Sequence, residues 1–433
     1  MRTSTLTPLQ KHNFHHLYWD VFWWGALAGS TLAFLPVFLA RLNATSFEVG
    51  LLTAGPAVVS IIISMLAGRL MRGRDILRVT RVTSILHRLG YVLLVPLPWL
   101  LGAREQVWAA LGLTLLFSFP GTVISISFNA MFADLVAAEW RPHVVGRRNA
   151  LLSLSMTFGT LGCGWLLDAL VFPLNYQLVF AIGVFGAALS SYHLWRLMPV
   201  NEVPLRLGKP MRDFARQGWV MVGDAVRSPT GLRYLLRQSG KTMLPLELLR
   251  TPFGPFIFSY FIFYMFQYVS VPIFPLYYVQ TLDLTDGVIS LGYAVFHVAM
   301  MASSMALGWV NQRMNSHRVL TVSALLYCVY PLFMGLANGP GMVILASVLG
   351  GLVWGIGNGQ MVSVLMDRTP EDERPAYMAL HNLILNVGIL GGSFIGPFVG
   401  LFLGLRGAVL AGAALRLAAG VVMGALARPR AAE

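Results

Sequence analysis

The stretch ADLVAAEWRPHVVGRRN, residues 133–149, has a second copy in MDRTPEDERPAYMALHN, residues 366–382. Each copy has an aspartate, an Arg-Pro pair seven residues later, and a cation followed by asparagine seven residues beyond the arginine. A single offset (367 minus 134, or 233 residues) carries Asp134, Arg141, Arg148 and Asn149 onto Asp367, Arg374, His381 and Asn382. The sequence therefore predicts two halves of the same design.

The composition between these charged stretches indicates a membrane protein. The chain is 56% hydrophobic and only 11% charged, whereas soluble domains have about 25% charged residues. Its apolar runs reach about 20 residues, which is the length a helix needs to cross about 30 Å of hydrocarbon. The expected fold class is all-α and integral to the membrane.

The net charge of +13 does not indicate a nucleic-acid partner, because the basic residues lie between apolar runs and not on one solvated face. Cys163 and Cys328 both fall inside apolar runs, so neither a disulfide nor a metal site is expected, and no cofactor is implied. The N-terminus is interpreted as leading into an uncleaved first helix.

Twelve membrane spans are expected, six on each side of a polar stretch. They are 17–40, 47–71, 76–102, 106–136, 145–172, 174–197, 253–282, 287–314, 318–338, 340–366, 375–403 and 406–427. The predicted domains are a six-helix half over 1–197, a basic cytoplasmic linker over 198–252 and a second six-helix half over 253–433.

The distribution of Lys and Arg predicts the orientation. Of the 31 basic residues, 26 fall on the side of both termini and two, Arg88 and Arg416, fall inside spans. The other three, Arg41, Arg104 and Arg406, lie on the opposite side. Cytoplasmic loops carry the excess of positive charge, so both termini are expected in the cytoplasm. The protein is expected in the inner (plasma) membrane, as a multi-pass monomer.

Within the linker, apolar residues recur at helical spacing beside arginines. This pattern has two interpretations, an amphipathic helix lying on the anionic inner leaflet or a helix packed beneath the bundle. The residues that form the pattern are Met211, Phe214, Ala215, Trp219, Val222 and Val226, with Arg212 and Arg216 beside them.

Both copies of the repeated stretch face the same side, where the fourth helix of each half leads into the fifth. Halves that face the same way are parallel repeats. After the eighth span, Gly308, Val310, Arg313, Asn315, His317 and Arg318 follow the spacing of a family motif, G-x-L-x-D-R-x-G-x-R-R, with Gln312 in place of its Asp. After the second span Gly68 and Leu70 fit the motif, but Arg72 stands at the acidic position.

On these residues the chain resembles the major facilitator superfamily. The resemblance implies two six-helix halves around a central site, and transport by alternating access. A Gly-Pro cluster, GGSFIGPFVG at 391–400, is similar to a motif of drug antiporters in this superfamily, although close helix packing explains it equally well.

The charged loops on the cytoplasmic side are interpreted as a gate. Arg313 and Arg318 leave the eighth span near Asp367, and Asp134 lies near Arg72 or Arg74. Exposed pairs of this kind are worth about 0–1 kcal/mol each, which suits a latch that opens in every cycle. The alternative is a set of solvated loop charges that only fix topology. The expected gate residues are Gly68, Arg72, Arg74, Asp134, Arg141, Gly308, Arg313, Arg318, Asp367 and Arg374.

Ionisable side chains inside apolar spans are costly and mark candidate sites. Asp20 is either a proton or cation site or a residue that reaches the interface. Arg88 either pairs with Asp20 or binds substrate. His297, near the midplane, either carries a proton between states or only packs. Arg416 forms either an internal hydrogen bond or a substrate contact.

Uncharged polar residues complete the expected substrate and proton pathway. They either line the pathway or hold helices together. Together with Asp20, Arg88 and His297, the expected pathway residues are Asn129, Asn149, Tyr264, Gln267, Asn358, Gln360, His381 and Asn382.

The predicted function is secondary active, proton-coupled export of a small organic molecule. Uptake of a small neutral or anionic metabolite with protons is the alternative. A membrane enzyme or a non-transporting receptor is a third reading, but the chain has no G-x-x-x-x-G-K-[ST] or H-E-x-x-H signature, so no enzyme activity is expected.

Overall fold

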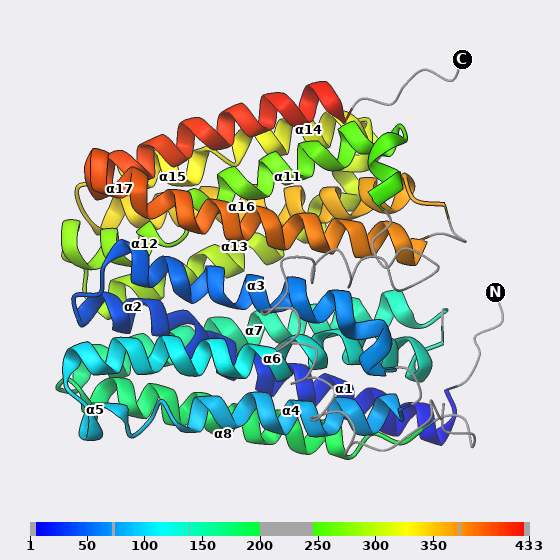
Figure 1. Cartoon of the computed structure of the whole chain (residues 1–433), viewed down its shortest axis with the longest axis horizontal. Helices are drawn as coiled ribbons and strands as arrows, with labels where there is room; N and C mark the ends of the chain where they lie inside the picture. Colours follow the sequence, from blue (N-terminus) through cyan, green and yellow to red (C-terminus); the bar gives the residue numbers. More distant parts are fainter. Residues whose placement is uncertain (1–5, 72–73, 138, 200–245, 371–373, 428–433) are drawn as a thin grey trace, which may run out of the picture.

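The computed structural model describes residues 6–71, 74–137, 139–199, 246–370 and 374–427. Every regular element in these ranges is helical. In Figure 1 the helices form two groups, with the N-terminal half below and the C-terminal half above. The predicted amphipathic helix within 198–252 lies almost entirely outside the described residues, because 200–245 are not described.

The N-terminal half consists of long helices that run back and forth along one direction (Figure 1). These are α1 (Pro8–Leu27), a π-helical turn η1 (Ala28–Leu32), α2 (Ala33–Arg41), α3 (Ser46–Met71), α4 (Ile76–Val92), α5 (Leu97–Leu100), α6 (Ala103–Leu135), α7 (Arg141–Ala169) and α8 (Leu174–Trp195). Polar caps start several of them. The Thr7 hydroxyl accepts from the Gln10 N–H, and the Gln10 side chain accepts from the Thr7 N–H, which is a capping box.

The C-terminal half repeats this plan. It contains η2 (Leu246–Arg250), α11 (Phe253–Val269), α12 (Ile273–Leu276), the π-helical turn η3 (Tyr277–Thr281), α13 (Asp286–Arg313), α14 (Ser316–Leu326), α15 (Val329–Gly335), α16 (Pro340–Asp367) and α17 (Arg374–Leu426). A π-helical turn therefore occurs in the first long helical segment of each half. We call the end of the bundle where α1 begins the inner end, and the opposite end, where α2 ends and α13 begins, the outer end.

Ten helical stretches in the described part of the chain are long and apolar enough to cross a membrane. Three of the expected spans differ from this pattern. The expected span 76–102 is divided into α4 and α5, since Pro96 and Pro98 interrupt it. The last two expected spans form one 53-residue element, α17, which turns at Gly404 with φ 68°, a conformation that favours glycine. The number twelve and the cytoplasmic termini remain predictions.

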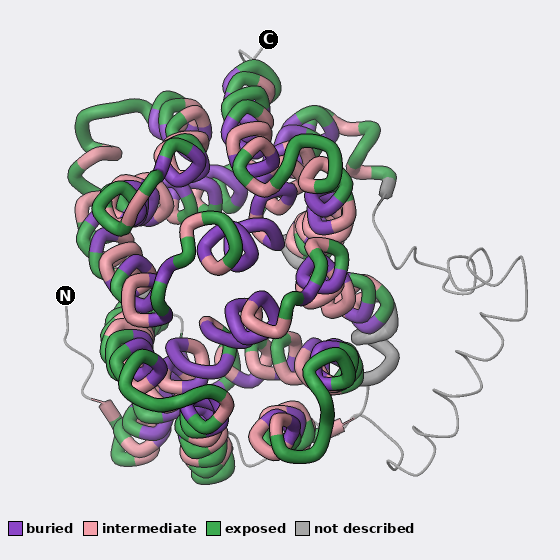
Figure 2. The backbone as a smooth tube through the Cα atoms, turned by 90° about the vertical axis from the view of Figure 1, so that its left-hand side faces the viewer, coloured by how far each residue is buried: buried purple, intermediate pink, exposed green. Residues whose placement is uncertain are grey.

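Two pairs of long helices make the most extensive contacts between the halves. α3 packs against α17, and α7 packs against α13. Seen end-on in Figure 2, exposed positions gather on the outer sides of the bundle. Large apolar side chains are exposed, including Phe402 at 85% exposure and Trp165 at 73%. An apolar exterior of this extent suits contact with lipid.

Close packing explains the Gly-Pro cluster at 391–400. A Cβ at Gly392 would lie 2.2 Å from the carbonyl oxygen of Met265, and one at Gly396 would lie 2.1 Å from that of Val269. Both glycines therefore let α17 approach the backbone of α11, as small residues do in membrane bundles.

Candidate functional site

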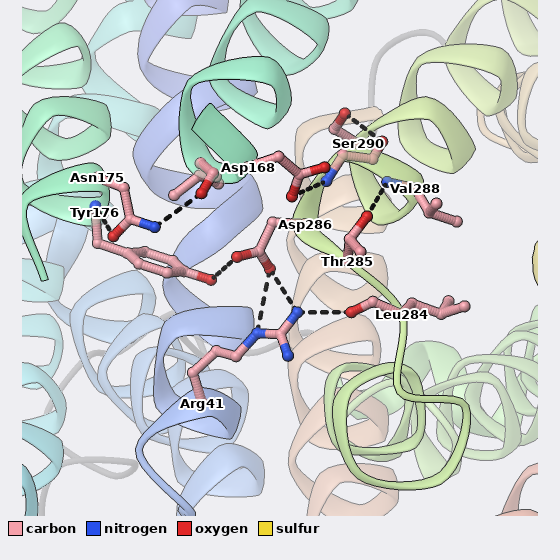
Figure 3. A network of polar contacts seen from close by, with 11 residues as sticks. Arg41, Asp168, Asn175, Tyr176, Leu284, Thr285, Asp286, Val288 and Ser290 are labelled. Carbon is pink, nitrogen blue, oxygen red and sulfur yellow. Dashed lines mark hydrogen bonds and ion pairs between the residues drawn. The ribbon is translucent and has the colours of Figure 1, made fainter. Parts of the chain in front are cut away.

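Salt bridges and hydrogen bonds join the two halves at the outer end (Figure 3). Arg41, the last residue of α2, lies 3.1 Å from the carboxylate of Asp286 at the start of α13. The same guanidinium donates to the Leu284 carbonyl at 2.6 Å, and the Tyr176 hydroxyl donates to Asp286 at 3.0 Å. Asp168 accepts from the Gly287 N–H at 3.0 Å. Helix α13 thus begins with two carboxylates, where the helix dipole favours negative charge.

A first cavity of about 540 Å³ lies on the inner side of the N-terminal half and also reaches α17. Its charged centre is Asp20 of α1, whose carboxylate accepts from the Ser190 hydroxyl at 2.6 Å. Arg88 of α4 lies 3.7 Å from Asp20, and Arg148 of α7 lies 3.4 Å from it. The structure therefore forms the predicted Asp20–Arg88 pair and adds a second arginine to it.

This cluster holds one carboxylate against two guanidinium groups, which leaves an excess of one positive charge. Within the described part of the chain, Arg88 Nε and Arg148 Nη1 are buried without a hydrogen-bond partner. The Arg148 guanidinium also lies over the rings of Phe128 and Phe132 at 4.7 and 5.7 Å, in cation–π contact. The first cavity is therefore suited to a neutral or anionic ligand group.

A second cavity of about 530 Å³ lies between the halves, and its wall combines aliphatic residues with eight aromatic side chains. Among the described residues, Arg416 of α17 is its only charged wall residue if histidines are taken as neutral. The Arg416 side chain donates to the Gln267 carbonyl at 2.9 Å and to the Ser270 hydroxyl at 3.0 Å. Both acceptors lie where α11 stops and the chain bends toward α12, so Arg416 caps the end of a broken helix.

The two cavities follow each other along the same helices. On α1, Trp24 lines the first cavity and Ala28, the first residue of η1, lines the second. On α3, Pro56 belongs to the first cavity and Thr53 to the second. Each cavity has the size of a small-molecule site.

The two histidines of the predicted pathway lie in different places, one on a cavity wall and one outside both walls. His297 lines the second cavity, and its Nδ1 pairs with the Tyr293 carbonyl at 2.7 Å. His381 pairs through Nε2 with the Tyr264 hydroxyl at 3.0 Å and lies in neither cavity wall. Gln267 lines the second cavity.

The predicted pathway amides divide into two groups. Asn129 and Asn382 line the first cavity, and Asn382 donates to the Ser64 hydroxyl of the other half at 3.3 Å. Gln360 is buried and donates to the Ser316 carbonyl at 3.1 Å, so it joins α16 to α14. Asn149 and Asn358 are exposed and lie in neither cavity wall.

Three charged residues of the predicted gate are described on the inner side of the C-terminal half. Among the described residues, Arg313, Arg318 and Asp367 form no ion pair with one another, and Arg313 lies over the Trp309 ring at 3.9 Å. Arg141 donates to the carbonyls of Ala133 and Val136 and thereby caps α6.

The remaining gate residues lie in loops or helix ends. Asp134 is exposed and Arg74 is half-buried. A Cβ at Gly308 would meet no atom within 4 Å, so packing does not require glycine there. Arg72 lies outside the described residues, and the side chains of Gly68 and Arg374 also lie outside them, although both backbones are helical.

Three charged residues were missing from the predicted site. Arg148 was counted as a loop cation, but α7 begins at Arg141, so Arg148 lies two turns inside the helix and reaches Asp20. The Arg41–Asp286 pair joins two loop-end charges that are 245 residues apart. The signal for Arg148 was the repeat, which aligns it with His381.

In the described part of the chain no group of three His, Cys, Asp or Glu side chains has the geometry of a metal site.

Long apolar helices around charged internal cavities define a multi-span membrane protein. The family model "Major Facilitator Superfamily" matches residues 256–433. A bacterial homologue of the iron transporter ferroportin, solved in an inward-facing state, has a TM-score of 0.72 at 14% identity. The similarity covers 98% of this chain and 100% of the homologue. A D-xylose-proton symporter has a TM-score of 0.66 at 14% identity and covers 96% of each chain.

A curated relative is similar over a short region. Solute carrier family 2, facilitated glucose transporter member 2, of Gallus gallus is 31% identical over 110 residues. The match covers 25% of this chain and only 21% of that relative's length. The family model thus matches the C-terminal part of the chain, and the solved structures share its fold over nearly its whole length.

Proposed function

We propose that the protein is a secondary transporter that moves a small organic molecule across the membrane by alternating access. The observation that carries this proposal is the position of the Arg41–Asp286 bridge. It joins the halves at the outer end, while the cavities that contain Asp20 and Arg416 lie deeper between the helices. A site closed at one end by a breakable pair is what alternating access requires.

The gate residues at the inner end fit this cycle. Arg313, Arg318 and Asp367 are exposed and unpaired with one another in a state whose outer end is bridged. We propose that they pair when the inner end closes, at the expense of Arg41–Asp286. Each pair is weak, at about 0–1 kcal/mol when exposed, so the two states can exchange without a large barrier.

The proposed transport is proton-coupled export, and His297 and His381 are the candidate proton carriers. The alternative is proton-coupled uptake of a neutral or anionic metabolite, which the buried arginines of the cavities favour. In either direction the protein acts as a monomer in the inner (plasma) membrane. A receptor or a membrane enzyme of the same fold is a less favoured alternative.

Transport is tested without knowing the substrate. Inside-out and right-side-out vesicles that contain the protein are incubated with a metabolite extract of the expression host, and mass spectrometry identifies compounds that accumulate. The variant carries Arg41→Cys and Asp286→Cys in a background with Cys163→Ser and Cys328→Ser, and is assayed before and after bridging with a short thiol cross-linker. The matched control carries Arg41→Cys alone.

We expect at least one compound to accumulate with the parent protein and the unbridged pair, and to stop accumulating after bridging. Vesicle orientation then gives the direction, and an uncoupler tests the proton. If no compound depends on the protein, or if bridging leaves accumulation unchanged, alternating access at this site is contradicted.

A further inference from the structure

Arg416 is a buried cation that pairs with no carboxylate of the described part of the chain. Its side chain is 5% exposed, and its hydrogen-bond acceptors are a backbone carbonyl and a hydroxyl, both neutral. Within the described residues, its Nε has no partner. An arginine does not lose its proton in a protein, so this site holds a full positive charge that the fold leaves uncompensated. Such a charge inside a membrane protein is costly and marks a functional position.

The described surroundings of Arg416 provide no negative charge. Among the residues that the structure describes, no aspartate or glutamate lines the second cavity, whose wall includes Tyr268, Tyr327, Tyr330 and Trp354. Phe274 presents its ring to the guanidinium at 5.9 Å. The cluster around Asp20 differs, because its two arginines already share a carboxylate. Both cavities therefore have an excess of one positive charge, but in the second cavity the guanidinium has no carboxylate partner among the described residues.

We infer that the second cavity binds a small aromatic carboxylate, with its carboxylate on Arg416 and its ring among the tyrosines and Trp354. This inference rests on the proposed transport function and names the substrate class for it. A planar carboxylate matches the fork of one guanidinium. A phosphate dianion would need further cations, and the described wall of this cavity has none apart from Arg416.

The aromatic walls supply the remaining recognition. Offset and edge-to-face contacts with rings favour an aromatic ligand over an aliphatic one of the same size. Tyr278 and Tyr330 already bond to each other through their hydroxyls at 2.6 Å, so these two hydroxyls have a partner within the wall. At about 530 Å³ the cavity accepts one or two rings.

The test uses three probes of one shape and different charge: 4-phenylbutyrate, 4-phenylbutyramide and 4-phenylbutylamine. Thermal unfolding of the detergent-purified full chain is followed with each probe at millimolar concentration, because a ligand bound only by the folded state raises the Tm. The parent protein is compared with Arg416→Gln and with Gln267→Glu. Gln267→Glu is isosteric and places a carboxylate on the same cavity wall. It is expected to fold, and it therefore tests the site even if Arg416→Gln does not fold.

Arg406→Gln is the matched control. Arg406 belongs to the same helix, bonds to the Ala337 carbonyl at 3.1 Å and lies in neither cavity wall. We expect phenylbutyrate to raise the Tm of the parent and of Arg406→Gln by several degrees, the amide and the amine to have at most a small effect, and both cavity variants to lose the response to the acid.

Three results would overturn the inference: equal effects of the three probes, no effect of any of them on the parent, or an acid effect that survives in both cavity variants. Failure here is distinct from failure of the proposed function. Vesicle accumulation that stops on bridging Arg41→Cys to Asp286→Cys supports transport whatever this screen shows. An acid effect without any vesicle accumulation supports binding and contradicts transport.

Discussion

Arg41 and Asp286 are 245 residues apart in the chain and meet at 3.1 Å across the boundary between the two halves. Arg41 keeps 26% of its side chain exposed, whereas Asp286 keeps 9%. Asp286 is also held by the Tyr176 hydroxyl, so loss of Arg41 leaves a buried carboxylate with only one side-chain donor. This relationship makes the outer end the most direct place to perturb the balance between states.

We predict that Arg41→Ala opens the outer end. Removing the partner of a partly buried carboxylate costs about 1–2 kcal/mol, or roughly a 5- to 30-fold change in the ratio of states. The measurement is labelling of a cysteine placed by Thr53→Cys on the cavity wall, with an impermeant maleimide added at the outer face. Labelling should be faster by that factor. The swap Arg41→Asp with Asp286→Arg should restore the slow rate, and equal rates in all three proteins would contradict the gate.

Asp20 should be more important for stability than either of its arginines. Asp20→Asn leaves Arg88 and Arg148 buried beside each other without a counter-charge, which costs about 3–5 kcal/mol. Arg148→Gln leaves the Asp20–Arg88 pair intact and should cost about 1–2 kcal/mol. Thermal unfolding in detergent should give the highest Tm for the parent, a lower Tm for Arg148→Gln and the lowest Tm for Asp20→Asn.

The neighbouring exposed residue supplies the control for that ranking. Arg147 lies over the Tyr18 ring at 4.8 Å on the surface, so Arg147→Gln should change stability by no more than about 0.5 kcal/mol. A Tm for Asp20→Asn at or above that of Arg148→Gln would show that the cluster is not held by its carboxylate.

His297 is predicted to couple transport to protons. One ring nitrogen is engaged by the Tyr293 carbonyl, and the residue lines the second cavity, so the other nitrogen is the site for a proton. His297→Ala should retain exchange of substrate across vesicles and lose accumulation driven by a pH gradient. His143→Ala, at an exposed position beside Trp140, should retain both. Gradient-driven accumulation in His297→Ala would assign the residue to packing.

Two glycines of the C-terminal half should respond oppositely to alanine. At Gly396 the new methyl would lie 2.1 Å from the Val269 carbonyl, so α17 must shift and stability should fall by about 1–3 kcal/mol. At Gly308 the methyl would meet nothing within 4 Å. There alanine should be neutral or should stabilise the helix by about 0.5–1 kcal/mol. Comparison of the two Tm values tests the assignment of the Gly-Pro cluster to packing.

Hydrophobic runs predicted the helical regions well because membrane helices must be long and apolar. The same runs gave no sign of η1 and η3, since a π-helical turn needs one extra residue and no special composition. The sequence also did not predict that the last two spans are joined by a turn at Gly404. Residues 375–403 and 406–427 read as two helices with a loop, and the structure turns between them at a single glycine.

The site was predicted only where a charge was out of place. Asp20, Arg88, His297 and Arg416 were visible because each interrupts an apolar run. Arg41, Asp286 and Arg148 resembled ordinary loop charges. Their partners become visible only in the structure, where the end of α2 meets the start of α13 and α7 packs on α1. For Asn149 and Asn358 depth in the span was known, but the direction of the side chain was not, and neither reaches a cavity wall.

Each half contains a π-helical turn, where the helix is wound less tightly than an α-helix. η1 and η3 lie in the first long helical segment of their halves, and both border the second cavity. If such a turn relaxes to α-helical winding, everything beyond it rotates by one residue's step, about 100°. That rotation would replace the side chains of Ala28 or Tyr278 on the wall by their neighbours. The shape of the cavity could then be retuned by a screw motion inside one helix, with no displacement of the bundle around it.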